Sequence, residues 1–186
     1  MSGKDQDLDF THGPAKPVVP TPEQKASAAK EASTGGPQLA KTGFYVAMAR
    51  HSSGGRVAPR NGQRHSVLVV EDDADMSKLV GEVLAKAGYL TRFARDKVQI
   101  NDEFNKPPLP DLVLLDVTLP DADGFQILEK IRSIPRIARI PVIMMTGKSE
   151  VTDVARGLSL GADGYVTKPF RISSLVSAVN TVLGND

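Results

Sequence analysis

Residues 67–72 read Val67-Leu68-Val69-Val70-Glu71-Asp72, which is four apolar residues followed directly by two carboxylates. A short, continuous apolar run of this kind is typical of a strand that is buried on both faces of a sheet. Three later runs also end at a polar residue: Asp116 after 112–115, Thr146 after 142–145, and Lys168 after 165–167. Parallel strands place their C-terminal ends along one edge, so we expect all these polar side chains to meet there.

Helical patterns alternate with the strands from residue 65 onward. After residues 67–70, apolar residues spaced by three and four form one stripe that ends before Gly88: Met76, Leu79, Val80, Val83, Leu84 and Ala87. The alternation continues with expected strands at 89–94, 112–115, 142–145 and 165–167, and expected helices at 97–104, 123–131, 149–160 and 172–183. The pattern predicts an α/β fold, a five-stranded parallel sheet with helices on both faces.

The composition changes near residue 64. Residues 1–64 contain repeated prolines and glycines and carry 9 basic against 5 acidic residues, whereas the remainder carries 14 against 17. We therefore expect a flexible, mildly basic N-terminal extension over 1–64 and one folded domain over 65–186. Two short stretches stand out: 22–32 favours a transient helix, and 44–48 is an apolar patch. That patch is a docking motif, a segment that folds back on the domain, or a run without a role.

The composition also limits where the protein can act. The chain of 186 residues has no cysteine, which excludes disulfides, thiolate metal ligands and cysteine nucleophiles. No apolar run approaches the roughly 20 residues that a membrane-spanning helix needs. We expect a cytoplasmic protein that does not insert into a membrane.

The residues at the strand ends suggest phosphoryl chemistry with a hard metal. Glu71, Asp72 and Asp116 would crowd like charges at a partly buried edge, which is costly unless a cation neutralises them. Carboxylate oxygens favour Mg²⁺ or Mn²⁺, and an aspartate can itself become phosphorylated. The Lys168 ammonium and the Thr146 hydroxyl are suited to balance the oxygens of a transferred phosphoryl group.

The motifs resemble those of bacterial response-regulator receiver domains over residues 66–184: 69–73, 116–120 with 123–124, 146–147, and 161–170. The resemblance implies a flavodoxin-like (βα)5 fold. It also implies that Asp116 is the phosphoacceptor, Glu71 and Asp72 the acidic pair, Thr146 the switch hydroxyl, Tyr165 the switch aromatic residue and Lys168 the invariant lysine.

The resemblance further implies a metal site formed by Asp72, Asp116 and the backbone carbonyl of Thr118, with Glu71 acting through water. Asp73 is then a helix cap or a peripheral charge. A cis peptide bond is expected between Lys168 and Pro169. Thr118 and Lys148 occupy variable positions that modulate the lifetime of the acyl phosphate in the family. We expect Lys148→Ala to change the dephosphorylation rate, the alternative being that Lys148 simply faces solvent.

We therefore predict a stand-alone response regulator rather than an enzyme, with at most self-catalysed phosphorylation and dephosphorylation. Its expected partners are a histidine kinase or a histidine phosphotransfer protein, and a downstream protein that binds a switched surface at about residues 150–183. The donor would dock beside Met76 and Val80 and near Pro169-Phe170. No helix-turn-helix is evident, so we expect no direct DNA binding.

Three alternatives remain open. The first is an interaction module of receiver fold that works without phosphorylation, and the second is a receiver fragment of a hybrid histidine kinase. The third is a hydrolase with an aspartyl-phosphate intermediate. It is disfavoured because the haloacid dehalogenase pattern places a second aspartate where this chain has Thr118.

Overall fold

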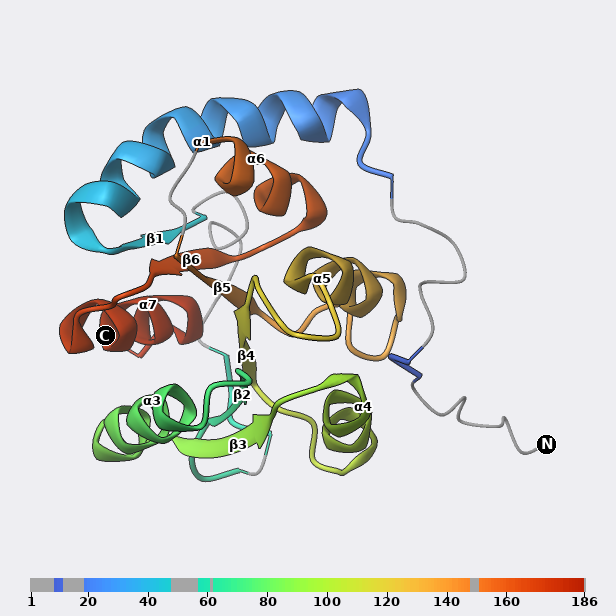
Figure 1. The fold of residues 1–186 in the computed structure, drawn as a ribbon, viewed down its shortest axis with the longest axis vertical. Helices are drawn as coiled ribbons and strands as arrows, with labels where there is room; N and C mark the ends of the chain where they lie inside the picture. Colours follow the sequence, from blue (N-terminus) through green and yellow to red (C-terminus); the bar gives the residue numbers. More distant parts are fainter. Residues whose placement is uncertain (1–8, 12–18, 48–56, 61, 148–150, 186) are drawn as a thin grey trace.

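The computed structural model describes residues 9–11, 19–47, 57–60, 62–147 and 151–185. Their centre is a six-stranded sheet in the order β1-β6-β5-β4-β2-β3 (Figure 1). All neighbouring strands are parallel except β1 and β6, which run antiparallel. The sheet thus has a fully parallel body with one extra strand at its edge.

The elements of the parallel body alternate along the chain, as the sequence predicts. The strands are β2 (Ser66–Val70), β3 (Leu90–Ala94), β4 (Leu112–Asp116), β5 (Val142–Thr146) and β6 (Gly164–Thr167). The helices are α3 (Ala74–Lys86), α4 (Lys97–Asn105), α5 (Gly124–Ser133), α6 (Val151–Leu160) and α7 (Ile172–Leu183). The predicted α/β fold with helices on both faces is therefore confirmed.

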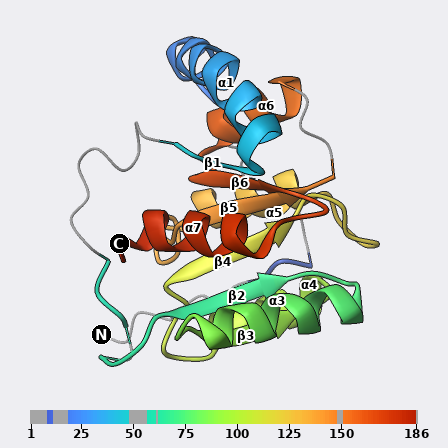
Figure 2. The ribbon, with the colours of Figure 1, turned by 90° about the vertical axis from the view of Figure 1, so that its left-hand side faces the viewer.

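Two apolar layers separate the helices from the sheet. Residues of β2, β4 and β5 alternate between the faces: Leu68, Val113 and Met144 pack on the side of α4, α5 and α6, and their neighbours in sequence pack against α3 and α7. Figure 2 shows α3 and α7 together on one face of the sheet. Burial on both faces explains why these strands are continuously apolar.

The helices that follow β2 and β4 begin immediately beside the strand ends. Asp73 caps α3 by accepting a hydrogen bond from the amide of Met76 at 2.8 Å, and Asp123 caps α5 by accepting one from Phe125 at 2.8 Å. Carboxylate caps suit helix N-termini because the free amides there need acceptors. Of the two roles expected for Asp73, helix cap and peripheral charge, the structure shows the helix cap.

The N-terminal part departs from the expected flexible extension at residues 22–46. Residues Pro22–Thr42 form α1, and Phe44–Val46 form β1, which adds the sixth strand to the predicted five. Helix α1 lies along α6, and β1 pairs with β6 (Figure 1). Residues 44–47 of the apolar patch therefore fold back on the domain. The domain boundary near residue 64 remains a prediction.

Small residues explain why α1 forms despite Gly35, Gly36 and Pro37. The buried side of α1 repeats at helical spacing: Ala28, Ala32, Gly35, Gly36 and Leu39. A Cβ on Gly35 would lie 2.8 Å from the ring of Tyr45, so a larger residue there would push that ring away. Tertiary packing thus outweighs the low helix propensity of these residues.

No helix in the described part of the chain is both long and apolar enough to cross a membrane. The cytoplasmic location expected from the sequence stays a prediction.

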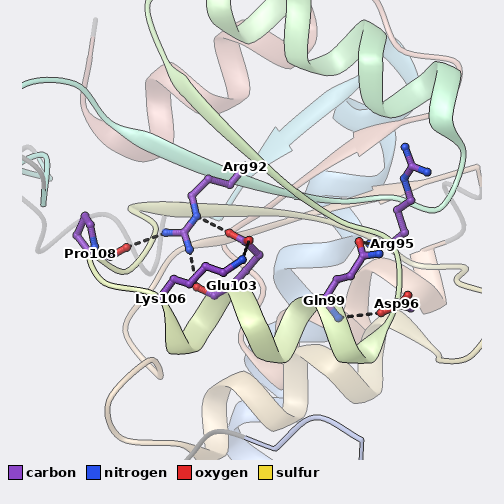
Figure 3. Close-up of polar contacts among 7 residues, drawn as sticks. All are labelled: Arg92, Arg95, Asp96, Gln99, Glu103, Lys106 and Pro108. Carbon is purple, nitrogen blue, oxygen red and sulfur yellow. Dashed lines mark hydrogen bonds and ion pairs between the residues drawn. The ribbon is translucent and has the colours of Figure 1, made fainter.

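A half-buried ion pair between Arg92 of β3 and Glu103 of α4 links the two elements (Figure 3). The guanidinium of Arg92 donates to the Glu103 carboxylate at 2.5 Å and to the backbone carbonyls of Glu103 and Pro108 at 2.6 and 2.7 Å. The side chain of Glu103 is only 14% exposed and also accepts a hydrogen bond from Lys106. The Glu103 carboxylate therefore forms ion pairs with both Arg92 and Lys106 at the edge of the sheet.

We expect Glu103→Gln to lower the free energy of unfolding by about 1–2 kcal/mol at neutral pH, since charge-assisted hydrogen bonds are lost. Burial alone would raise the pKa of Glu103, but hydrogen bonds and charges from Lys106 and Arg92 outweigh it and hold the pKa below its ordinary value. Stabilisation by such a group is present above its unfolded pKa and is lost as pH falls through the folded pKa.

Urea unfolding at neutral pH and at about pH 3, well below the unfolded pKa, measures this difference. The gap between wild type and Glu103→Gln should be smaller at the acidic pH. A gap of the same size at both pH values would show that the ionised carboxylate contributes nothing.

Candidate functional site

The C-terminal ends of β2, β4, β5 and β6 lie level at one edge of the sheet. The register pairs Val70 with Leu115, Leu115 with Met144, and Thr146 with Thr167. The residues at or just after these ends are therefore neighbours in space. They include the polar residues that the sequence singles out: Glu71, Asp72, Asp116, Thr146 and Lys168.

Lys168 joins two of the acidic residues. Its Nζ donates to Glu71 Oε2 at 2.5 Å and to Asp116 Oδ2 at 2.7 Å. The Glu71 and Asp116 side chains are only 2% and 8% exposed. The cis bond to Pro169 that the resemblance implies is present, and the Lys168 amide donates to the Thr146 carbonyl at 2.7 Å. Three chain segments thus converge on Asp116.

The second oxygen of Asp116 is also held. Asp116 Oδ1 accepts a hydrogen bond from the amide of Thr118 at 3.0 Å, while Oδ2 contacts Lys168. This arrangement fixes the plane of the carboxylate. It places Thr118 directly against Asp116, as expected for a residue that flanks the site.

Glu71, Asp72 and Asp116 form a carboxylate cluster. Each offers an oxygen, and these oxygens all lie within 4.8 Å of one another. Glu71 and Asp116 are buried and Asp72 is exposed, so the cluster opens to solvent on one side. Oxygen donors of this charge and spacing fit a hard divalent cation that keeps some of its waters.

The electrostatics of the site agree with that fit. Burial raises the pKa of Glu71, an effect opposed by the hydrogen bond from Lys168 and reinforced by the charge of Asp116. Burial alone would lower the pKa of Lys168, but its hydrogen bonds and charge interactions with Asp116 and Glu71 outweigh it and raise that pKa. Lys168 therefore stays protonated, and one lysine is shared by two buried acids.

A glycine allows α5 to begin beside Asp116. A Cβ on Gly124 would lie 2.2 Å from the Asp116 carbonyl oxygen and 2.8 Å from the Val117 Cα. The Gly124 amide donates to the Val117 carbonyl at 2.9 Å, and Thr118 bridges to Asp123. The tight loop that presents Asp116 thus depends on a residue without a side chain.

The two expected switch residues are both buried. Thr146 is 3% exposed at the end of β5, and Tyr165 is fully buried in β6. The Tyr165 hydroxyl lies 3.3 Å from the Val154 carbonyl of α6. A Cβ on Gly157 would fall 1.7 Å from the same hydroxyl oxygen. Burial, with the nearby charge of Asp153, raises the pKa of Tyr165. The expectation about Lys148 lies outside the described residues.

Sequence reasoning missed three residues around the site. Ser77 Oγ donates to the Glu71 carbonyl at 3.1 Å, Gly157 makes room for Tyr165, and Tyr45 of β1 pairs with Tyr165. Two of them carried a sequence signal: Gly157 lies within an amphipathic helix, where a larger residue is usual, and Tyr45 lies in the apolar patch at 44–48.

The fold is a (βα)5 body with one added N-terminal strand, and the comparisons agree with this architecture. Residues 67–180 match the response regulator receiver domain family, so the chain belongs to that family. Receiver domains are phosphoacceptors that bind Mg²⁺ through acidic residues.

Curated relatives and solved structures are similar over the same region. The Escherichia coli phosphate regulon transcriptional regulatory protein PhoB is 38% identical over 117 residues, which cover 63% of this chain and 51% of PhoB. The DNA-binding dual master transcriptional regulator RpaA of Synechocystis is 36% identical over 63% of this chain and 48% of RpaA. The chain spans about half the length of these curated relatives.

Two solved structures show the same fold. A putative response regulator from Chloroflexus aurantiacus superimposes with a TM-score of 0.62 at 31% identity, covering 66% of this chain and 99% of its own. Chemotaxis protein CheY4 of Vibrio cholerae gives 0.61 at 27% identity, covering 64% of this chain and 99% of its own.

The expectation of no direct DNA binding is contradicted by these relatives. PhoB and RpaA are named as transcriptional regulators, and RpaA as DNA-binding. The expectation rested on the lack of a helix-turn-helix pattern in this sequence. That reasoning was wrong because the region compared is the receiver domain, which relatives combine with further segments of comparable length.

Proposed function

We propose that this chain captures a phosphoryl group on Asp116 in a Mg²⁺-dependent reaction and thereby switches a protein-binding surface. The observation that carries the proposal is the pair of contacts from Lys168 to Glu71 and Asp116 at the ends of β6, β2 and β4. A lysine held against the acceptor carboxylate is placed to contact the incoming phosphoryl oxygens as well.

The transfer exchanges one bond for another. An oxygen of Asp116 attacks the phosphorus of a phosphohistidine on a histidine kinase or histidine phosphotransfer protein. The P–O bond forms as the P–N bond breaks, and the electron pair returns to the imidazole nitrogen, which takes a proton from solvent. Lys168 and the Thr146 hydroxyl then bind the phosphoryl oxygens, and the Thr118 amide orients the carboxylate.

Asp72, Asp116 and the Thr118 carbonyl would hold the proposed metal, with Glu71 acting through water; Mn²⁺ would fit the same oxygens. A bound cation supplies positive charge that offsets the crowded carboxylates and the charge on the phosphoryl oxygens.

The responding surface is proposed to be the side formed by α6, β6 and α7. Thr146 and Tyr165 border this side, so a movement of either side chain would change the surface formed by α6, β6 and α7. The resemblance makes Tyr165 the switch aromatic residue, and in the structure its ring is buried. Because α1 and β1 lie on α6 and β6, a partner there would also meet the N-terminal segment.

Labelling with acetyl phosphate and Mg²⁺ tests the proposed acceptor. Wild type should gain one phosphoryl group by intact mass, and Asp116→Asn should gain none. Labelling that survives in Asp116→Asn, or that is absent from folded wild type, would overturn the proposal.

The three consecutive acids at 71–73 provide a matched test of the metal site. We expect Asp72→Asn to weaken Mg²⁺ binding by at least about tenfold, because even indirect partners of a metal contribute that much. Asp73→Asn should bind Mg²⁺ like wild type, since asparagine also caps helices. Calorimetric titration with Mg²⁺ measures both, and equal losses in the two variants would refute the assignment.

The second candidate function is the control of gene expression by the phosphorylated protein. The names of the relatives favour it. PhoB and RpaA are both named as transcriptional regulators and share this receiver region. A comparison of transcripts between cells carrying wild type and Asp116→Asn at the native locus tests it. Identical transcripts under conditions that phosphorylate the wild type would exclude this output.

A further inference from the structure

Strand β1 places one tyrosine beside another. Strand β1 lies beside β6 (Figure 2). The two strands pair antiparallel, and Tyr45 lies directly opposite Tyr165. The amide of Ala47 donates to the Asp163 carbonyl at 2.9 Å, and that of Thr167 donates to the Gly43 carbonyl at 3.0 Å. Opposite residues of an antiparallel pair project to the same face, so the two tyrosine side chains are neighbours.

The ring of Tyr45 is held firmly. Its hydroxyl donates to Glu31 of α1 at 2.9 Å, and the ring packs on Gly35, where a Cβ would come within 2.8 Å. Tyr45 is 5% exposed, and burial, with the hydrogen bond and charge of Glu31, raises the pKa of its hydroxyl. Helix α1 therefore fixes Tyr45 against the edge of β6.

Tyr165 is enclosed by α6 and by the strands on both sides of β6. Its side chain occupies the space over Gly157 under α6, and its strand is flanked by β5 on one side and by β1 on the other. Side chains move between staggered rotamers, and on a strand this swings a ring along the same face of the sheet. On the β1 side of Tyr165, the same face of the sheet carries Tyr45, and both side chains belong to one buried apolar cluster.

The same face also carries Thr146. Tyr165 is paired with Met144, and Thr146 follows Met144 by two residues, so its side chain projects to the side of Tyr165. A restraint on Tyr165 can therefore affect Thr146, which belongs to the proposed phosphoryl site.

We propose that Tyr45 is a positioning residue for phosphoryl capture: it holds Tyr165 in the buried orientation, so that the N-terminal segment sets how readily Asp116 becomes phosphorylated. The inference rests on the proposed function. If phosphoryl binding and burial of Tyr165 favour the same conformation, each favours the other by the same factor, and a residue that stabilises buried Tyr165 also strengthens phosphoryl binding. The N-terminal segment then acts as an input to the site, because displacing β1 weakens phosphoryl capture.

The test measures beryllofluoride, a stable phosphoryl mimic, binding to the full chain in Mg²⁺. We expect Tyr45→Ala to raise its apparent dissociation constant by about fivefold or more, the lower range of typical couplings between sites. Tyr45→Phe keeps the ring and should bind nearly like wild type. Phe44→Ala removes a neighbouring β1 side chain from the opposite face and is the matched control. It should leave the constant unchanged.

A second readout reports Tyr165 itself. The chain has three tyrosines, so ring-labelled protein gives few NMR signals, and Tyr45→Phe assigns one of them. In Tyr45→Ala the Tyr165 signal should shift or broaden, an effect that loss of stability alone does not produce below the unfolding transition. If Tyr45→Ala does not fold, Gly35→Ala replaces it, since the added Cβ displaces the Tyr45 ring while favouring the helix.

The outcomes separate the two proposals. Beryllofluoride that fails to bind wild type overturns the proposed function and this inference together. Beryllofluoride that binds wild type and Tyr45→Ala equally, with the Tyr165 signal unchanged, overturns this inference alone. Equal weakening by Phe44→Ala with β1 still paired to β6 also overturns it, because a side chain on the face away from Tyr165 would then matter as much as Tyr45.

Discussion

Lys168→Met should destabilise the protein by about 3 kcal/mol in the absence of Mg²⁺, because removal of one partner leaves buried charges uncompensated. Lys168 is the cation in direct contact with both Glu71 and Asp116, whose side chains are 2% and 8% exposed. Addition of Mg²⁺ should recover part of the loss, since the metal offsets the same two acids. Labelling by acetyl phosphate should be strongly slowed even in Mg²⁺.

Urea unfolding with EDTA or with Mg²⁺ measures the stability of this variant. Lys106→Met is the matched control: it removes an ion pair to Glu103 from a lysine that is 62% exposed. Exposed pairs contribute no more than about 1 kcal/mol, so its effect should be small and independent of Mg²⁺. A loss below about 1 kcal/mol for Lys168→Met would show that the lysine does not neutralise the acids.

Gly124→Ala is the second change with a large expected effect. The added Cβ would lie 2.2 Å from the Asp116 carbonyl oxygen and 3.0 Å from its carbonyl carbon, both of them backbone atoms that cannot rotate away. We expect a loss of at least about 3 kcal/mol, the upper range for overpacking. Because Asp116 itself must shift, phosphoryl labelling should fall sharply as well.

Gly147→Ala is the control for Gly124→Ala. Gly147 follows Thr146 at the same edge of the sheet, and a Cβ there meets nothing within 4 Å. Its stability and labelling should stay close to wild type. Thermal unfolding and labelling of the two variants side by side check the prediction, and similar behaviour of both would contradict it.

Much of the parallel sheet and of the site could be predicted from the sequence. Continuous apolar runs such as 67–70 and 142–145 are recognisable because strands buried on both faces need no polar alternation. The convergence of Glu71, Asp116 and Lys168 followed from the rule that parallel strands end at one edge. Their contacts in the structure agree with that expectation, while their roles in phosphoryl transfer stay predictions.

The N-terminal elements could not be predicted in the same way. Gly35, Gly36 and Pro37 interrupt the pattern of α1, and only the bulk of Tyr45 explains why a glycine is favourable at position 35. Strand β1 has three residues and gains its hydrogen bonds from β6, which lies more than a hundred residues later in the chain. Pairings at such distance leave no local signal.

The most direct measurement identifies the residue that carries the phosphoryl group. The chain is labelled with acetyl phosphate in Mg²⁺, reduced with borohydride to convert an aspartyl phosphate to homoserine, digested and sequenced by mass spectrometry. The account predicts conversion at Asp116 and at no other aspartate, and none when EDTA replaces Mg²⁺. Conversion at Asp72 or another acid, or labelling that proceeds equally well without the metal, would contradict it.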